Sequence, residues 1–169
     1  MREVATSADL SVGAVMYHFP TTEDLLLAVH TDVQVRYLQS RKAAADSRGD
    51  AWSRLLNVFK AGLPPFAERE MIELLYEMHG LTRRSPRHAV LLTELWKEEL
   101  ALCCQIVSDG SSEGVFFVDD EKRVAQALLA LEDGLALHLV SNNSALDSGA
   151  ALRAYTASAA AILGRVRPA

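Results

Sequence analysis

Helix start signals recur along the whole chain, and they restrict the possible folds more than any other feature of the sequence. Six runs of apolar residues at helical spacing each follow a side chain that can cap the first turn of a helix, at Ser11, Thr21, Asp50, Ser85, Asp120 and Asp147. Only residues 114–118 have a strand-like composition, and they are too few to support a sheet, so we expect an apolar loop there. The sequence therefore predicts an all-α fold.

The length and composition of the chain suit one sizeable core. The chain has 169 residues, of which 50% are hydrophobic, so a stable core needs neither a disulfide nor a metal. The longest apolar stretch, residues 124–140, is interrupted by Gln126, Glu132, Asp133 and His138, which argues against a membrane span. The first residues lack the basic and then apolar pattern of a secretion signal. We therefore expect a cytoplasmic protein without a membrane partner.

Cys103 and Cys104 are the only cysteines and are adjacent in a helical pattern. Neighbouring side chains on a helix point about 100° apart, so the two thiols are poorly placed to form a disulfide with each other. A redox-sensing pair is the alternative to two small hydrophobic side chains. We expect two small hydrophobic side chains.

Residues 2–27 follow the order of the last two helices of a helix-turn-helix. A short helix is expected around residues 3–7, then a tight corner at residues 8–10, then a second short helix that begins after Ser11. A new helix with an acidic first turn, which suits the helix dipole, begins at Thr21. In a helix-turn-helix, the second helix contacts bases in the major groove of DNA.

Residues 2–26 of this segment, REVATSADLSVGAVMYHFPTTEDLL, resemble the DNA-binding pattern of tetracycline-repressor-type (TetR) transcriptional regulators. The matched motifs are I-A at residues 4–5, A-G-V-S at residues 8–11, Y-x-x-F at residues 16–19 and K-x-x-L at residues 22–25. The segment EGVFFVDDEKRVAQALLALEDGLALHL is similar to the C-terminal half of one large branch of the family, where a two-helix dimer interface follows. The resemblance covers nearly the whole chain.

The resemblance implies a homodimeric, ligand-responsive repressor that a small-molecule effector releases from double-stranded operator DNA. It implies a helix-turn-helix head with a connecting helix in residues 1–38, and a helical ligand-binding and dimerisation domain in residues 39–169. In the family pattern, one further helix precedes the matched segment. The head is therefore expected to be partial, without the first helix of the DNA-binding domain.

The resemblance also places the DNA contacts. Residues of the second helix would lie nearest the bases, and residues at its end and beyond it nearest the phosphates: Ser11, Val12, Gly13, Ala14 and Tyr17 for the bases, and Tyr17, His18 and Thr22 for the phosphates. Core packing is the alternative for the aromatic residues Tyr17 and Phe19. We expect core packing for Phe19 only.

Three substitutions and the local charge weaken the predicted binding to DNA. The family's corner glycine is Asp9 here, and a left-handed corner costs an L-residue roughly 1–2 kcal/mol, although Asp tolerates it better than most residues. Met16 and Thr22 replace a tyrosine and a lysine that would contact phosphates. Residues 1–45 carry four basic and five acidic side chains, whereas a DNA-binding face is normally basic. We expect weakened or lost binding to operator DNA.

An effector cavity is expected between helices of the body, with mostly apolar walls and a few polar groups. The candidate walls are Phe59, Phe66, Leu74, Trp96, Cys103 and Phe116, and the candidate polar contacts are Glu73, Glu77 and Glu132. Alternatively, the apolar residues are plain core, and Glu73 and Glu77 lie on an ordinary solvated helix face. The sequence does not identify the effector, although aromatic side chains beside carboxylates would suit a cation.

The last two predicted helices, in residues 120–142 and 147–166, carry more apolar surface than one neighbour can cover. A two-fold four-helix bundle between two copies would cover the remainder, through Leu128, Leu131, Leu135, Leu139, Leu152, Tyr155 and Ile162. Packing within one subunit is the alternative. We expect a homodimer.

No motif of the sequence indicates an enzyme. The chain lacks a glycine-rich phosphate loop, an H-E-x-x-H motif and a nucleophile elbow. His30, His79, His88 and His138 are scattered without ligand spacing, and we expect surface or packing histidines, with no metal and no cofactor. Two hypotheses follow: a ligand-responsive DNA-binding regulator, or a head-deficient dimeric small-molecule-binding protein without DNA binding of its own.

Overall fold

The computed structural model describes residues 1–65 and 67–165, and within them the chain forms helices and no strands. The helices are α1 (Arg2–Ser7), α2 (Val12–His18), α3 (Thr22–Ala45), α4 (Ala51–Ala61), α5 (Arg69–Leu81), α6 (Pro86–Ser112), α7 (Glu121–Val140) and α8 (Ser148–Ile162). The predicted all-α fold is confirmed.

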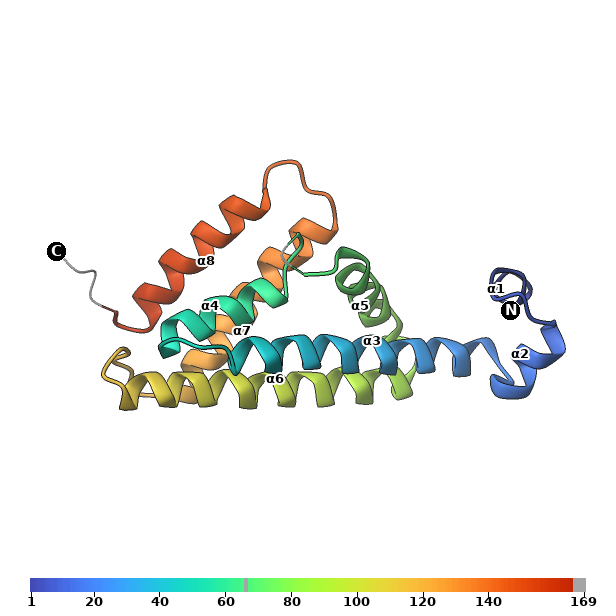
Figure 1. Ribbon diagram of the computed structural model, residues 1–169, viewed down its shortest axis with the longest axis horizontal. Helices are drawn as coiled ribbons and strands as arrows, with labels where there is room; N and C mark the ends of the chain where they lie inside the picture. Colours follow the sequence, from blue (N-terminus) through green and yellow to red (C-terminus); the bar gives the residue numbers. More distant parts are fainter. Residues whose placement is uncertain (66, 166–169) are drawn as a thin grey trace.

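Two long helices, α3 and α6, lie side by side and set the long axis of the molecule (Figure 1). The small head formed by α1 and α2 lies beyond the N-terminal end of α3. In the body, α4 and α5 pack on α3 and α6, α7 packs on α6, and α8 packs on α7. The helix that leaves the head therefore continues directly into the centre of the body.

The predicted helix starts are confirmed, and most are capped by the expected side chain. Ser11 accepts a hydrogen bond from the Ala14 amide at 3.1 Å, and Thr21 forms a reciprocal capping box with Asp24. Asp50, Asp120 and Asp147 accept from the amides three residues ahead at 2.9, 3.0 and 2.7 Å. At the start of α6, the chain uses Pro86 in the first turn after Ser85, without a side-chain cap.

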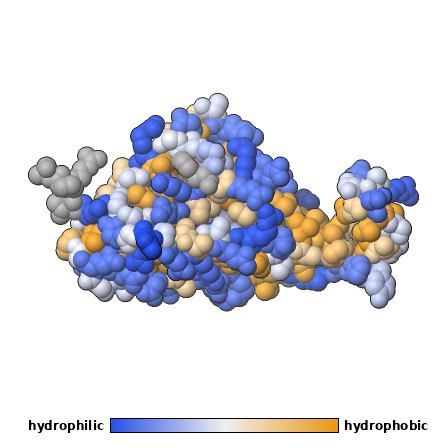
Figure 2. All heavy atoms as spheres, viewed as in Figure 1, coloured by the Kyte–Doolittle hydropathy of each residue, from blue (hydrophilic) through white to orange (hydrophobic). Residues whose placement is uncertain are grey.

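The corner between α1 and α2 is left-handed, as predicted. Asp9 has a φ of 53°, a region that L-residues other than Asn and Asp seldom adopt. The head presents apolar side chains to solvent, and Figure 2 shows hydrophobic surface on the head and on the neck that joins it to the body, with Val4, Leu10, Val12 and Met16 exposed. The head thus buries little of its own apolar surface.

The body has two cores. The main core joins α4, α6, α7 and α8, and a second core lies where α3, α5 and α6 meet. The loop at residues 114–118 is apolar and tucked against the main core as predicted: Phe116 is buried over Gly110, whereas Phe117 is 65% exposed. None of the described helices combines the length and apolarity of a membrane-spanning segment. The proposed boundary at residue 38 lies within α3, and the division into two domains stays a prediction.

Candidate functional site

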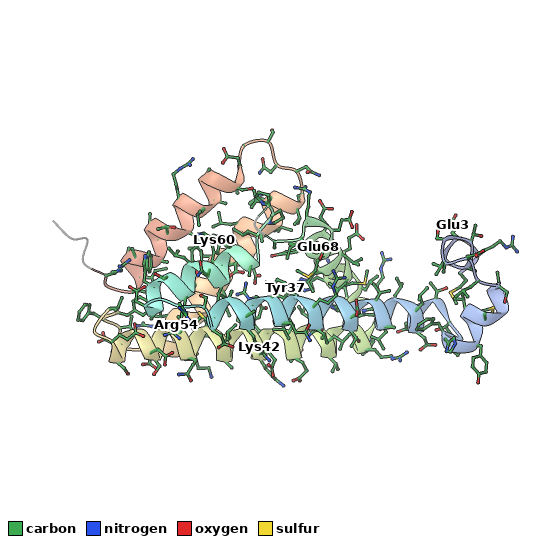
Figure 3. The ribbon with its side chains drawn as sticks, in the orientation of Figure 1. Glu3, Tyr37, Lys42, Arg54, Lys60 and Glu68 are labelled. Atoms are coloured by element: carbon green, nitrogen blue, oxygen red, sulfur yellow. The ribbon has the colours of Figure 1, made fainter. Side chains whose placement is uncertain are left out.

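A fully buried arginine joins the helices of the body. The guanidinium of Arg41, on α3, forms a two-pronged ion pair with Glu132 of α7, with Nη2 3.1 Å from Oε2. Its Nε lies 3.3 Å from Glu99 Oε1 of α6, and the Tyr37 hydroxyl contacts both Arg41 Nη1 and Glu99 Oε1 at 3.1 Å. We call Tyr37, Arg41, Glu99 and Glu132 the Arg41 cluster. In contrast, Lys42, the next residue of α3, lies on the outer surface (Figure 3).

The Arg41 cluster has room only because residue 62, just after α4, is glycine. A Cβ atom built on Gly62 would lie 2.6 Å from Arg41 Nη1 and closer still to the Glu132 carboxylate. The end of α4 also supplies the Val58 carbonyl, which accepts a hydrogen bond from Arg41 Nη1 at 3.3 Å. The Arg41 cluster therefore connects α3, α4, α6 and α7.

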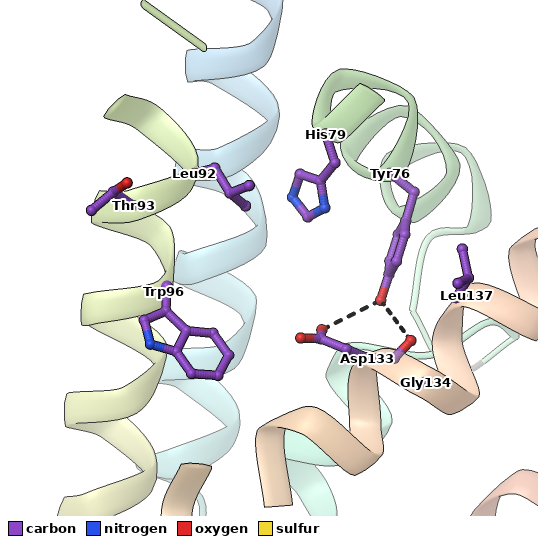
Figure 4. A pocket seen from close by; sticks show the side chains of 8 residues that line it. All are labelled: Tyr76, His79, Leu92, Thr93, Trp96, Asp133, Gly134 and Leu137. Atoms are coloured by element: carbon purple, nitrogen blue, oxygen red, sulfur yellow. Dashed lines mark hydrogen bonds between the residues drawn. The ribbon is translucent and has the colours of Figure 1, made fainter. Parts of the chain in front are cut away.

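A cavity of about 550 Å³ opens between α5, α6 and α7, beside the Arg41 cluster. Its lining residues are Tyr76 and His79 of α5, Leu92, Thr93 and Trp96 of α6, and Asp133, Gly134 and Leu137 of α7 (Figure 4). The Tyr76 hydroxyl reaches across to Asp133, 3.5 Å from Oδ1 and 3.4 Å from the backbone carbonyl. The cavity therefore combines aromatic and aliphatic walls with one carboxylate.

Burial shifts the pKa values of the carboxyl groups in this region upward. It raises the pKa of Glu132 to about 7, against the opposing effect of the Arg41 ion pair, and it raises the pKa values of Glu99 and Asp133. Burial lowers the pKa of His79, so its ring is neutral at pH 7. Because the guanidinium of Arg41 is shared by two carboxylates, an additional positive charge in the cavity would be stabilised.

A second hollow of about 440 Å³ adjoins the cavity and shares Tyr76 and Leu137 with it. The predicted polar contacts Glu73 and Glu77 lie in this hollow rather than in the cavity, and Glu73 forms an ion pair with Arg69 at 2.6 Å. Both glutamates thus line the adjoining hollow and not the cavity itself.

The other residues predicted for the cavity are divided between it and the core. Trp96 lines the cavity, and Glu132 lies behind its wall in the Arg41 cluster. The structure instead places three predicted wall residues in the main core, Phe59, Cys103 and Phe116, and Leu74 packs against the second core. Phe66 lies outside the described residues. Both cysteines carry free thiols, and Cys103 is buried.

Sequence reasoning missed Tyr76, His79 and Asp133 as lining residues. Two of them lie next to residues that were proposed for the cavity: Tyr76 lies between the two proposed glutamates on α5, and Asp133 follows Glu132 on α7. Which of two adjacent acids faces the cavity depends on the rotation of α7. A sequence of mixed apolar and acidic residues does not determine that rotation.

Three histidines that are far apart in the sequence come from different helices and lie close together between the cavity and the head. His30 Nδ1 of α3 lies 2.9 Å from His88 Nδ1 of α6, and both residues are fully buried. The rings of His30 and His79 have centroids 6.4 Å apart. Across the described parts of the chain, no three histidine, cysteine or acidic side chains are arranged to hold a metal ion.

Acid unfolding tests the burial of His30. Burial, and then His88 and His79, lowers its pKa to about 4, so between about pH 6.5 and pH 4 the unfolded state binds more protons than the folded state. This difference makes the unfolding free energy fall by about 1–2 kcal/mol from pH 7 to pH 5. The raised pKa of Glu132 has the opposite effect on the pH dependence of the unfolding free energy. The measurement therefore compares urea unfolding of wild type and His30→Gln at both pH values. The variant is expected to lose less stability on acidification, while exposed His138→Gln behaves as wild type.

The predicted DNA-contact residues lie on the exposed side of the head. Tyr17 is 83% exposed and its ring meets the edge of His18, with centroids 5.2 Å apart. Val12, Gly13, His18 and Thr22 are also exposed, Ala14 is half-buried, and Ser11 is exposed and occupied in capping α2. Val15 is the buried residue of α2, and Phe19 is half-buried. Val12, Tyr17, His18 and Thr22 are thus accessible for contact with DNA.

The residues predicted for the dimer interface are divided by the fold. Leu128, Leu139 and Tyr155 are buried within the subunit, where Tyr155 stacks on Phe59 at a centroid distance of 3.6 Å. Leu131, Leu135 and Leu152 are half-buried, and Ile162 is 37% exposed. Only this second group is available to a partner subunit.

The comparisons with known proteins agree with this architecture. Residues 51–164 match the family model of the BetI-type transcriptional repressor, C-terminal domain. No curated protein sequence matches the chain significantly. Among solved structures, a transcriptional regulator from Rhodococcus has a TM-score of 0.84 at 22% identity, covering 99% of this chain and 87% of that one.

Two further structures share the fold. A TetR transcription regulator from Haloarcula marismortui has a TM-score of 0.78 at 22% identity, covering 95% of this chain and 83% of that one. A transcriptional regulator from Saccharomonospora viridis, solved in complex with choline, has a TM-score of 0.77 at 20% identity, covering 95% and 82%. Because the family model spans most of the chain and the fold agrees throughout, the chain belongs to the TetR family of transcriptional regulators, which are not enzymes, and its C-terminal domain is of the BetI type.

Proposed function

We propose that this protein is a homodimeric, ligand-responsive repressor of the TetR type, released from operator DNA by a small molecule. The observation that carries the proposal is the cavity between α5, α6 and α7, because α5 and α6 both pack on α3, the helix that bears the head. A ligand that binds better to one position of α5 shifts the equilibrium toward that position. Through the His30–His79 contact, the shift moves α3 and changes the spacing of the two heads.

The ligand that fits the cavity best is a small organic cation. Tyr76 and Trp96 offer aromatic faces, and the Asp133 carboxylate offers a counter-charge. The similar regulator from Saccharomonospora viridis was solved with choline, which has this chemistry. A cavity of about 550 Å³ is ample for a ligand of that size.

Choline and its neutral isostere 3,3-dimethyl-1-butanol test this ligand class. The chain has two tryptophans, so Trp52→Phe leaves the fluorescence of Trp96 as a reporter of the cavity. Choline is expected to bind about tenfold more tightly than the isostere, because a desolvated cation–π contact contributes about 1–2 kcal/mol. Asp133→Asn is expected to weaken choline binding about tenfold and to leave binding of the isostere unchanged.

The matched control is Asp119→Asn, an exposed acid outside the cavity, which should leave both affinities unchanged. Equal affinities for choline and the isostere in wild type would contradict a cation site. So would an Asp133→Asn variant that binds choline as wild type does.

The proposed dimer uses the faces of α7 and α8 that their own subunit leaves uncovered. Small side chains at helical spacing are exposed on both helices, at Ala127 and Ala130 of α7 and at Ala154, Ala157 and Ala161 of α8. Small residues allow close approach of helices, and the neighbouring half-buried leucines supply apolar area for a four-helix bundle. Light scattering at micromolar concentration is expected to give twice the mass of the chain, and a monomeric mass would overturn the dimer.

A second candidate is a dimeric small-molecule-binding protein without DNA binding of its own. The observation in its favour is the head, where apolar Val4, Leu10 and Met16 are exposed and acidic side chains outnumber basic ones. Selection from a pool of random DNA duplexes separates the two candidates. Enrichment of a palindromic sequence, lost in Tyr17→Ala, supports the regulator, whereas no enrichment by a choline-binding dimer supports the second candidate.

A further inference from the structure

The wall behind the cavity holds more negative than positive charge. Glu99, Glu132 and Asp133 come from α6 and α7, and the guanidinium of Arg41 is the cation within their reach. Glu99 and Glu132 are buried in direct contact with Arg41, and Asp133 follows Glu132 at the cavity surface. With all three acids ionised, three negative charges face one positive charge, and two of the three, on Glu99 and Glu132, lie in a poorly hydrated region. That arrangement is costly unless a proton or another cation compensates it.

The remaining titratable groups around these acids carry no charge at neutral pH. They are Tyr37 of α3, Tyr76 and His79 of α5, Cys103 of α6 and Tyr155 of α8. Burial raises the pKa values of the tyrosines and of the cysteine, and it lowers the pKa of the histidine. The tyrosines and the cysteine therefore add no negative charge, and His79 adds no positive charge.

We infer that the three acids retain a shared proton while the cavity is empty and release it to solvent when an organic cation binds beside Asp133. This inference rests on the proposed cation ligand. The exchange is balanced in charge, because one ammonium group enters as one proton leaves, and no covalent bond other than the O–H bond changes. The proton belongs to the coupled set of carboxyl groups rather than to one residue.

Release of a proton has a definite sign in the binding equilibrium. Binding that releases a proton becomes tighter as the pH rises, by up to about tenfold per pH unit while the acids remain protonated in the empty cavity. The affinity for choline is therefore expected to rise between about pH 6 and pH 8 and then to level off. A cation site with fully ionised acids would show a flat profile over this range.

Two measurements test the inference. Difference infrared spectra of the ligand-free protein at pH 7 should contain the C=O stretching band of a protonated carboxyl group, and saturating choline should remove it. Calorimetric titration with choline in phosphate and in Tris should give enthalpies that differ in proportion to the ionisation enthalpies of the buffers, corresponding to up to one proton released per cation.

Glu99→Gln is the informative variant, because its amide oxygen can still accept from Tyr37 while one negative charge is removed. We expect choline to bind and to release less than about half as many protons as in wild type. The matched control is Glu98→Gln, the adjacent exposed acid that pairs with Lys42, which should release as many protons as wild type.

The outcomes separate this inference from the proposed function. Choline binding with identical enthalpies in both buffers, or a ligand-free protein without the carboxyl band at pH 7, overturns the inference and leaves the cation site standing. A band at pH 7 in a protein that does not bind choline overturns the cation site and, with it, the exchange of proton for ligand.

Discussion

Replacing Arg41 by methionine is expected to lower the free energy of unfolding by about 3–5 kcal/mol, the usual cost of removing one partner of a buried ion pair. The variant leaves Glu99 and Glu132 buried without their counter-charge, and the Val58 carbonyl without its donor. Methionine fills most of the volume of the arginine side chain, so the loss reports charge rather than a cavity. Urea unfolding followed by circular dichroism at pH 7 measures it.

The adjacent residue supplies the control. Lys42 pairs with Glu98 at 2.9 Å on the surface, and Lys42→Met should change the unfolding free energy by no more than about 1 kcal/mol. The pH dependence adds a second check. Without Arg41 the folded-state pKa values of the two glutamates rise further above those of the unfolded chain, so the stability of the variant falls as the pH rises through that range. Equal losses for Arg41→Met and Lys42→Met would contradict a structural role for the Arg41 cluster.

The helical framework could be predicted from the sequence because its determinants are local. Ser11, Thr21, Asp50, Asp120 and Asp147 each act on amides within their own first turn, so the position of the signal is the position of the helix start. The left-handed corner at Asp9 is local in the same way. Nothing about these features depends on which helix packs against which.

The cavity and the Arg41 cluster depend on contacts that no local pattern contains. Arg41 and Glu132 are 91 residues apart, and the histidines that meet between α3 and α6 are 58 apart. A signal for the cluster was nevertheless present, because Arg41 continues the apolar row of Val33 and Tyr37 at intervals of four. A charged side chain on a buried row of a helix indicates a buried partner, although it does not identify that partner.

The same limit explains the divided dimer prediction. Leu128, Leu135 and Leu139 of α7 are all apolar, and the sequence does not say which of them its own subunit covers. The packing of α7 on α6 and α8 decides this, and it buries Leu128 and Leu139 while Leu135 stays half-buried. Apolar periodicity predicts that a face will be buried, and tertiary packing determines by what.

Phe59→Ala is expected to lower the unfolding free energy by about 3–5 kcal/mol, as large-to-small changes of a buried aromatic residue do. Phe59 is 0% exposed, and its ring stacks on Tyr155 at an interplanar angle of 11°, which joins α4 to α8. The sequence predicted the same residue as a wall of the effector cavity. A place in the core and a place in the cavity wall predict different results for Phe59→Ala. Loss of a core side chain lowers the unfolding free energy, whereas loss of a wall side chain lowers the affinity for the ligand.

Trp96→Ala and Phe59→Ala therefore form an informative pair, with the stability of each measured by urea unfolding and choline affinity by calorimetry. Phe59→Ala should lose stability and, while folded, bind choline with near wild-type affinity, whereas Trp96→Ala should lose choline affinity about tenfold or more. Phe117→Ala, at an aromatic residue that is 65% exposed, is the control and should stay within about 0.5 kcal/mol of wild type. A Phe59→Ala variant with unchanged stability and lost choline binding would place Phe59 in the cavity wall after all. It would also mean that α4, rather than α5, forms the third side of the ligand site.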